Sequence, residues 1–339
     1  MQMKSSYFYI VFGLIWIVSC VISPEKPHED ASVLPADTAI VEEEPVEKRA
    51  VAADIVIEKE LLYDKHTLDD QYPYKDTVRE FRWDLIREKL LLVEKLRKES
   101  SQWGVLQNYK NRNGEAVLVK HYKRNVYNRI ADTLGVERFQ GVPLYLPSDT
   151  LVPEIYGLVG TLVRLLSDHP TFPTIERVDK AGAWCVPRKY LSLLSDTVSF
   201  EHVVFVDRTN QNITALEYKD ELSWRIRSMN PATTGQYRPP YAQVTPVGIF
   251  VLQEKKARMI YLVDGSQQTG GFAPYASRFV NGAYIHGVPV NAPQTKMIEY
   301  SPSLGTTPRS HMCVRNATSH AKFIYDWAPL RNALIFVLD

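Results

Sequence analysis

Short apolar runs bounded by Gly, Pro or Asp recur through the second half of the chain, and they restrict the folds open to it. Runs of this length are typical of buried strands, because helices need roughly ten residues or more. Three of them lie in the C-terminal part, at His202–Val206, Val247–Leu252 and Ala333–Leu338. The sequence therefore predicts a mainly β (α+β) fold, with a β-rich domain over residues 197–339.

Further runs precede this domain. They lie at Val142–Leu146, Leu162–Leu166 and Ala183–Pro187. Short strands separated by turn residues predict a small barrel over residues 141–196. Its end, Trp184–Leu191, resembles the last strand of bacterial SH3-like modules. Two roles for this module stay open, namely binding of the cell wall and packing without a ligand.

Residues 54–140 are expected to form a helical N-terminal segment. Val78–Ser100 predicts a helix, with Leu85, Leu92 and Leu96 near one face and charged residues on the rest. We expect this helix to pack on the neighbouring domain.

The first residues have the pattern of a targeting segment. Lys4 precedes an apolar run, Tyr7–Val18, which is too short to span a bilayer and which ends at Cys20. This pattern resembles a lipobox and predicts a lipoprotein signal peptide over residues 1–20, with Cys20 carrying the lipid. Residues 21–53, acidic and rich in Pro, predict a disordered tether. We therefore expect a lipoprotein of the cell envelope facing the periplasm; Val21, and not Asp, follows Cys20 and favours the outer membrane.

Charge and loop composition limit the partners. The net charge of the 339-residue chain is +1, which provides no electrostatic field that would attract nucleic acid.

The segment Asp264–Tyr284, rich in Gly and aromatic residues, predicts a long functional loop. Tyr275 and Phe279 are its candidates to line a lid over the substrate.

Three cysteines, Cys20, Cys185 and Cys313, do not form a disulfide framework. Cys185 lies in an expected buried strand. Cys313 precedes a short helix expected over Thr318–Tyr325, with Thr318 as its cap, and a helix N-terminus favours a thiolate. Together with His286 or His311 as base, Cys313 has the pattern of a thiol acyl-transfer enzyme. A buried thiol or a partial metal site with His320 stays open on these residues alone.

Three segments then carry a resemblance to one family. Thr245–Phe250 resembles the threonine-proline-x-glycine strand entry of the L,D-transpeptidases. Ile285–Gly287 resembles the segment with their catalytic histidine, and Ser310–Arg315 resembles their Ser/Thr-His-Gly-Cys motif. The resemblance covers roughly residues 200–339.

Two departures from the family pattern are visible. Met312 stands where the motif has glycine, and a side chain there narrows the approach of a backbone N–H to the substrate. His286 and Ser310 are 310 − 286 = 24 positions apart, more than is usual in the family. We interpret Val288–Arg309 as an inserted loop over the cleft.

The resemblance implies a role for each residue of the motifs. Cys313 is the nucleophile, His286 is the general base, and the carbonyl of Gly287 orients the imidazole ring. The N–H groups of His311, Met312 and Cys313 form the oxyanion hole.

Two further residues of the last motif take supporting or binding roles. Ser310, like His311, supports the site. Arg315 binds a substrate carboxylate, and a purely structural salt bridge is its alternative role.

The resemblance also implies the reaction. A tetrapeptide stem of peptidoglycan is cut before its terminal D-Ala, and a second stem's amine takes up the acyl group in a 3–3 cross-link. No cofactor or metal is required. Carboxypeptidase or endopeptidase activity at the same site, a non-catalytic wall-binding lipoprotein, and a thiol redox or metal protein are the alternatives.

Overall fold

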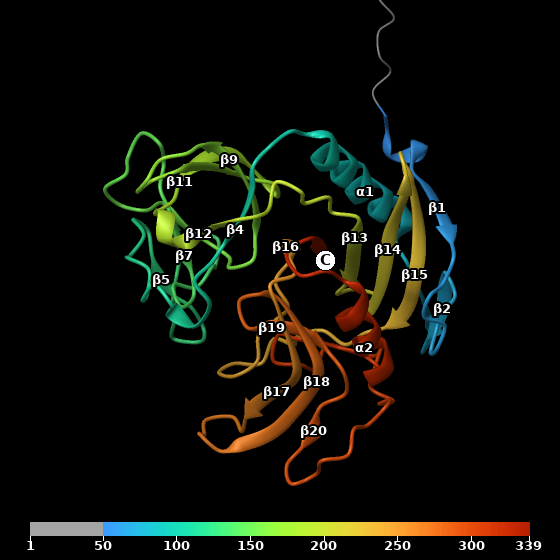
Figure 1. Cartoon of the computed structure of the whole chain (residues 1–339). Coiled ribbons are helices and arrows are strands. Elements are labelled where there is room, and N and C mark those ends of the chain that lie inside the picture. The colour runs from blue at the N-terminus through green and yellow to red at the C-terminus, as the bar shows by residue number, and fades with distance from the viewer. Residues whose placement is uncertain (1–49) are drawn as a thin grey trace, which may run out of the picture. The chain divides into compact units, whose positions relative to one another are not determined.

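The structure is a computed structural model that describes residues 50–339 (Figure 1). The expected signal peptide, Cys20 and residues 21–49 of the expected tether lie outside the described residues. In the described part the mainly β fold is confirmed, because strands outnumber the two α-helices many times over. Neither of those helices is long and apolar enough to cross a membrane.

The largest sheet has six strands in the order β1-β15-β14-β13-β22-β16. Its strands are β1 (Val56–Lys59), β13 (His202–Asp207), β14 (Asn212–Asp220), β15 (Ser223–Pro231), β16 (Gly248–Val251) and β22 (Ala333–Leu338). The three apolar runs predicted as strands are β13, β16 and β22. β13 and β22 pair in parallel near the middle of the sheet, and burial on both faces explains why their sequences are apolar throughout.

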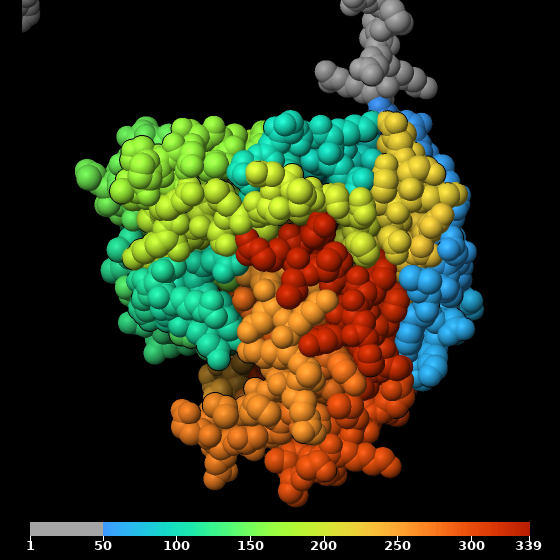
Figure 2. Space-filling model, viewed as in Figure 1, coloured from blue at the N-terminus to red at the C-terminus, as the bar shows by residue number. Residues whose placement is uncertain are grey.

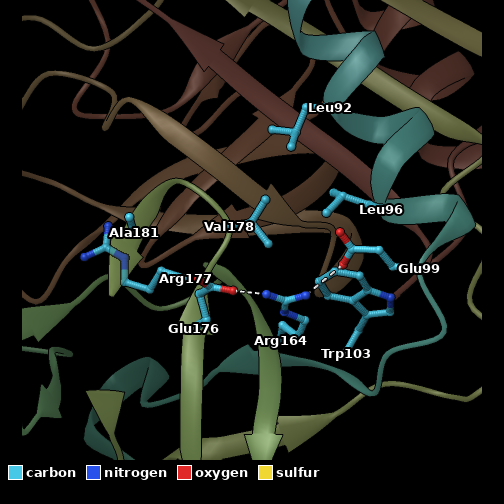
Figure 3. Close-up of a pocket in the computed structure, with 9 residues that line it drawn as sticks. All are labelled: Leu92, Leu96, Glu99, Trp103, Arg164, Glu176, Arg177, Val178 and Ala181. Atoms are coloured by element: carbon cyan, nitrogen blue, oxygen red, sulfur yellow. Dashed lines mark hydrogen bonds and ion pairs between the residues drawn. The ribbon is translucent and has the colours of Figure 1, made fainter. Parts of the chain in front are cut away.

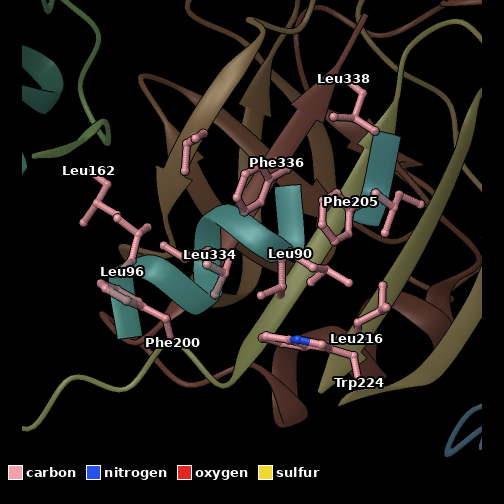
Figure 4. Close-up of a cluster of buried hydrophobic side chains, with 14 of the residues drawn as sticks. Leu90, Leu96, Leu162, Phe200, Phe205, Leu216, Trp224, Leu334, Phe336 and Leu338 are labelled. Carbon is pink, nitrogen blue, oxygen red and sulfur yellow. The ribbon is translucent and has the colours of Figure 1, made fainter. Parts of the chain in front are cut away.

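Helix α1 (Trp83–Lys98) covers one face of this sheet (Figure 4). Its buried stripe is Ile86, Leu90 and Val93, which packs with residues such as Phe336 and Trp224 in one core. Leu96 of the predicted stripe is buried as well, whereas the predicted Leu85 and Leu92 are only partly buried against this core. The helix also begins later than predicted.

The later start of α1 has a local cause. Residues 77–80, expected to be helical, form strand β3 (Thr77–Glu80), which pairs with β2 (Gln71–Tyr74). The turn between them holds Lys75 at a φ of 53°, and the hairpin satisfies its backbone groups before the helix begins. Because β1 also pairs with β15, residues 54–140 are not a helical segment, and their first strand belongs to the large sheet.

A second unit, which we call the middle module, extends from β4 to β12 (residues 103–193). Its main sheet has the order β11-β10-β9-β4-β12. The strands of the whole module, including the short pairs outside this sheet, are β4 (Trp103–Leu106), β5 (Lys123–Arg124), β6 (Ile130–Ala131), β7 (Val142–Leu144), β8 (Ile155–Gly157), β9 (Leu162–Ser167), β10 (Thr174–Arg177), β11 (Lys180–Cys185) and β12 (Leu191–Leu193).

The middle module has a hydrophobic core of its own, which includes Leu106, Leu144 and Ile175. β4 lies inside its sheet, between β9 and β12, so the module begins well before the predicted residue 141. Cys185 is buried at the end of β11, with its thiol 3.6 Å from Thr174 Oγ1. The likeness to an SH3-like barrel stays a prediction.

The third sheet has the order β17-β18-β19-β21, with β20 on β18. Its strands are β17 (Glu254–Leu262), β18 (Thr269–Val280), β19 (Ala283–His286), β20 (Val290–Asn291) and β21 (Val314–Arg315), and helix α2 (Thr318–Trp327) packs on it. The loop expected over Asp264–Tyr284 was wrong, since most of it is strand β18. Its backbone groups are satisfied by β17 on one side and β19 on the other.

The middle module contacts the third sheet at the turn between β18 and β19. Asn281 N–H donates to Val159 O (3.1 Å), and Val159 N–H donates to Asn281 Oδ1 (3.2 Å). Tyr109 and Tyr284 place their hydroxyls 3.1 Å apart. In Figure 2 the green atoms of the module abut the orange and red atoms of the C-terminal part. The turn that follows β18 is therefore fixed from outside its own sheet.

Candidate active site

Two short parallel strands bring the cysteine and the histidine together. In the pairing of β19 with β21, His286 lies opposite Arg315, and Asn316 N–H donates to His286 O at 2.9 Å. Cys313 precedes Arg315 by two residues, so both side chains point to the same face. Cys313, His286 and Arg315 accordingly share one side of the sheet.

This side forms the floor of a cleft of about 750 Å³. Such a volume lies within the range of small-ligand pockets, roughly 300–1,000 Å³. Cys313 is partly buried in it and His286 is 3% exposed. The cleft is lined by Cys313, His286, Arg315, Ser310, His311, Met259, Tyr261, Leu262, Val263, Asp264, Gly270, Ala273, Val288, Pro289, Asn291 and Ser301.

His286 is held as a neutral base. Its Nδ1 lies 2.6 Å from Gly287 O, so Nδ1 carries the proton and Nε2 keeps a free lone pair. Burial lowers the pKa of His286 to about 4. The charge of the nearby Arg315 also lowers this pKa, whereas the hydrogen bond to the Gly287 carbonyl raises it. The contact expected between this ring and the carbonyl of Gly287 is present. At neutral pH the imidazole is therefore ready to accept a proton.

Burial also acts on the ionisation of Cys313. Burial raises its pKa above the ordinary value, although the backbone N–H of Tyr284 and the charge of Arg315 oppose this. α2 begins at Thr318, as expected, but burial has the larger effect, so the pKa of Cys313 shifts in the direction opposite to the one predicted. A Cys313 that acts as a nucleophile would have to lose its thiol proton, and His286 is the neutral base that lines the same cleft.

Thr318 does not cap α2, as had been expected. Residue Ala317 holds the N-cap position, and no side chain caps it. Thr318 Oγ1 instead donates to Ile298 O at 2.6 Å and accepts from Val288 N–H at 3.1 Å. Val288 and Ile298 both lie in the segment Val288–Arg309, which we interpreted as an insertion over the cleft. Thr318 therefore anchors this segment at two points.

The backbone before Cys313 is fixed by two hydroxyls. Ser310 Oγ donates to Cys313 O and accepts from Met312 N–H at 3.3 Å. The buried Thr245 donates to Met312 O at 2.7 Å and accepts from Gly235 N–H at 2.9 Å. The Met312 N–H is thus already engaged, which leaves the N–H groups of His311 and Cys313 as the better oxyanion donors.

Comparison with known proteins identifies this part of the chain. Residues 201–337 match the family model of the L,D-transpeptidase catalytic domain, YkuD. This segment is an L,D-transpeptidase catalytic domain. A search of the curated proteins found no match.

Solved structures give more distant likenesses. An L,D-transpeptidase from Mycobacterium smegmatis is 17% identical, with 52% of this chain and 82% of that chain covered and a TM-score of 0.34. L,D-transpeptidase 3 from Mycobacterium tuberculosis, in complex with a faropenem-derived adduct, is 18% identical (54% and 93% covered, TM-score 0.32).

A fused Zn-dependent amidase/peptidase/peptidoglycan-binding domain-containing protein from Clostridium acetobutylicum is 18% identical, with a TM-score of 0.30. The likeness covers 41% of this chain, which spans about half (52%) of the length of that one. The family match, and not these likenesses, identifies the transpeptidase domain.

Arg315 brings a positive charge to the floor of the cleft in the transpeptidase domain. Its backbone is paired with Thr233 through two hydrogen bonds of 2.9 Å. Its Nε is buried and has no hydrogen-bond partner within residues 50–339. No carboxylate in that part of the chain forms an ion pair with it, so the structural salt bridge considered as its alternative role is not seen there. A guanidinium placed in this way is available to a carboxylate of a ligand.

The rim of the cleft joins the predicted His311 to residues that the sequence did not reveal, namely Asp264, Tyr261 and Asn291. His311 is exposed and contacts Asp264 Oδ2 across the cleft mouth through Nε2 at 2.9 Å. Tyr261 donates its hydroxyl hydrogen to Asn291 Oδ1 at 2.6 Å. Asp264 and Gly265 form the turn of a hairpin, and this pair was the only local signal for the rim.

Tyr275 and Phe279 do not line the cleft. Phe279 is fully buried in the core beneath the third sheet. Tyr275 packs its ring against Tyr325 of α2, 5.8 Å between centroids, with Lys322 over it. Both expectations were wrong because the lid they belonged to is strand β18.

A hollow of about 250 Å³ between α1 and the middle module lies elsewhere (Figure 3). The guanidinium of Arg164 spans it and pairs with Glu99, at 3.2 Å, and with Glu176. Its lining, all of it within the described chain, includes no Cys or His. Because its central charge is already paired, it is not a candidate for the chemistry of Cys313.

Proposed function

We propose that the chain is a cysteine acyl-transferase that remodels peptidoglycan, with Cys313 attacking a tetrapeptide stem before its terminal D-Ala. The observation that supports this most is the placing of Cys313, His286 and Arg315 on one face of two paired strands. They form the floor of the cleft in an L,D-transpeptidase catalytic domain.

The first half of the reaction forms a thioester. His286 Nε2 takes the thiol proton as Cys313 Sγ bonds to the carbonyl carbon of the third stem residue. Backbone N–H groups of His311 and Cys313 stabilise the oxyanion. The C–N bond then breaks, His286 returns the proton to the leaving nitrogen, and D-Ala departs.

The second half transfers the acyl group. An amine of a second stem attacks the thioester and gives a 3–3 cross-link, and water in its place gives a carboxypeptidase. An endopeptidase uses the same thioester on an existing cross-link. We favour transfer to an amine because Cys313 also borders a second cavity, of about 170 Å³, which His286 and Arg315 do not line.

Arg315 supplies the recognition of charge in this proposal. A stem peptide carries carboxylates, and a buried guanidinium without an acidic partner binds a carboxylate more strongly than an exposed one does. Met312, which departs from the family motif, is not among the residues that line the cleft. The departure therefore does not argue for a non-catalytic wall-binding protein.

The test uses the full chain, purified in detergent, with faropenem and with a tetrapeptide stem. We expect a stoichiometric covalent adduct by intact mass, lost in Cys313→Ala and formed far more slowly in His286→Ala, and release of D-Ala from the stem. A folded wild-type protein with a reduced Cys313 that forms no adduct and releases no D-Ala would refute the proposal.

We also propose that Cys20 carries a lipid and holds the enzyme in the envelope, facing the periplasm. The support is the apolar run Tyr7–Val18 that ends at this cysteine. Cells that express the chain and are fed radiolabelled palmitate should label the wild type and not Cys20→Ala. Equal labelling of the two proteins would exclude Cys20 as the site.

A further inference from the structure

A loop between strands β15 and β16 presents two tyrosine rings to the solvent. We call residues 236–243 the tyrosine loop. Its residues 237–241 are all exposed, and the exposed fractions of Tyr237 and Tyr241 are 63% and 51%. Neither hydroxyl has a hydrogen-bond partner within residues 50–339. Single exposed apolar side chains are ordinary, whereas two open rings on one short loop indicate a binding surface.

The tyrosine loop is attached to the segment that precedes the nucleophile. Gln236 N–H donates to Ser310 O at 3.0 Å, and Gln243 N–H donates to His311 O at 3.3 Å. The two ends of the loop are thus bonded to the residues three and two positions before Cys313. Both tyrosines follow or precede these contacts by no more than two residues, so the rings belong to the surroundings of the active site.

The tyrosine loop is also held in one shape. Arg238 and Ala242 exchange two backbone hydrogen bonds, of 3.1 and 2.9 Å, and two prolines between them have a fixed φ. From the middle module, Tyr127 donates its hydroxyl hydrogen to Ala242 O at 2.7 Å. Its ring meets that of Tyr237 edge-on, with 6.2 Å between centroids. Little conformational freedom is therefore lost when a ligand binds to the loop.

Tyr241 lies at the mouth of the cleft. Its hydroxyl oxygen is so close to the turn between β17 and β18 that a Cβ on Gly265 would lie 2.7 Å from it. The adjoining Asp264 contacts His311 across the same cleft mouth. Because Tyr237 contacts the middle module instead, the tyrosine loop extends from the cleft mouth toward that module.

The chemistry of this surface fits a sugar. The tyrosine loop contains one charged residue, Arg238, and it offers open aromatic faces together with free hydroxyls. A pyranose ring has an apolar C–H face that stacks on such a ring, and polar groups around its edge that bind water and hydroxyls. A stable protein partner would need roughly 800 Å² of matching surface, which is more than a strip of five exposed residues provides.

The proposed substrate would bring a sugar to this place. In peptidoglycan each stem peptide branches from a glycan strand of N-acetylated sugars. When the carbonyl of the third stem residue is at Cys313, the stem extends back to its sugar over about 10 Å, the length of three extended residues. The sugar must then lie near the cleft mouth, where Tyr241 is.

We propose that the tyrosine loop binds the glycan strand that carries the acyl donor, with the rings of Tyr237 and Tyr241 stacking on the faces of its sugars. The inference rests on the proposed function and adds that the enzyme recognises the sugar as well as the stem. No bond forms or breaks at the tyrosine loop. Its effect is on the binding of the donor.

The experiment compares two donors with the full-length enzyme. One is the free tetrapeptide stem, and the other is the same stem attached to its disaccharide of N-acetylglucosamine and N-acetylmuramic acid. The rate of D-Ala release gives kcat/KM for each. Wild type should prefer the donor with sugars about tenfold, and the double variant Tyr237→Ser/Tyr241→Ser should bring the ratio close to one, because two aromatic contacts are lost.

A matched control keeps the interpretation specific. Tyr122 of the middle module is 50% exposed and lines neither the cleft nor the second cavity at Cys313. Tyr122→Ser should keep the ratio of the wild type. Equal kcat/KM for the two donors in the wild type would overturn the inference, as would a preference that the double variant retains in full.

A second measurement does not depend on catalysis. Saturation-transfer NMR with chitotetraose and the full-length Cys313→Ala protein should show contact with the sugar. Contact should be lost when both tyrosines are replaced by serine and kept when both are replaced by phenylalanine, since the rings remain. Absence of contact with the folded Cys313→Ala protein would overturn the inference. Failure of the proposed function is distinct, because the wild type would then release no D-Ala from either donor.

Discussion

Met312 occupies a backbone conformation that normally requires glycine, and this makes a sharp prediction about stability. Its φ is 151°, in a region that L residues rarely adopt, at a cost of about 1–3 kcal/mol. The methionine is held there by the hydrogen bonds from Thr245 and to Ser310. Replacement by alanine keeps this strain, whereas replacement by glycine removes it.

The magnitude follows from three contributions. Both substitutions lose a partly buried methionine side chain, worth about 1 kcal/mol at half burial. Glycine ordinarily makes the unfolded chain more flexible, which costs about 0.4–1 kcal/mol relative to alanine. Relief of strain outweighs this. We therefore expect Met312→Gly to be about 1 kcal/mol more stable than Met312→Ala, the reverse of the usual order.

The free energy of unfolding in urea measures the difference, at one pH and for both variants. Met259, partly buried in strand β17 and not among the residues with positive φ, is the matched control. At this position Met259→Ala should be more stable than Met259→Gly. If Met312→Ala equals or exceeds Met312→Gly while Met259 shows the usual order, the argument from backbone strain is wrong.

Three further predictions concern the site. Gly287→Ala should destabilise the fold by about 1–3 kcal/mol in urea, because its Cβ would lie 2.7 Å from Thr318 Oγ1; unchanged stability would contradict this. Arg315→Met should lower kcat/KM for the stem peptide by about tenfold to a hundredfold in steady-state assays, and equal values would remove Arg315 from substrate binding. Burial lowers the pKa of His286 to about 4 and that of His320 to about 3. The unfolded chain therefore binds more protons below about pH 6.5, so each histidine should reduce the free energy of unfolding by about 2 kcal/mol between pH 7 and pH 5. Urea titrations that give the same free energy of unfolding at pH 7 and at pH 5 would refute this last prediction.

Residues next to one another in the sequence were the ones that could be predicted. The motif around Cys313 and the pair His286–Gly287 could be predicted because their residues are neighbours in the sequence. The buried strands could be predicted because each is a short apolar run. The residues that complete the cleft come from elsewhere in the chain: Tyr261 and Asn291 are brought to it by strand pairing. No local pattern distinguishes these side chains from ordinary surface residues.

The lid was predicted wrongly for a specific reason. The glycine content of Asp264–Tyr284 suggested a functional loop, but Gly270 and Gly271 mark close packing of strands. A Cβ on Gly271 would lie 2.0 Å from Val290 O, so glycine is needed where β20 approaches β18. Glycine in a strand can thus report a neighbouring backbone as well as a turn.

The ionisation of the site also depends on packing rather than on sequence. A cysteine before a helix predicts a thiolate, but the fold around β19 and β21 buries His286 and partly buries Cys313, and burial disfavours charge on both. A resting thiolate would react with any small electrophile that entered the cleft. A neutral thiol in the same cleft as a neutral base reacts only when an acyl carbon is held at the sulfur and an oxyanion can be stabilised. The raised pKa of Cys313 therefore favours selectivity for acyl groups, and simple alkylating agents should modify it slowly at neutral pH.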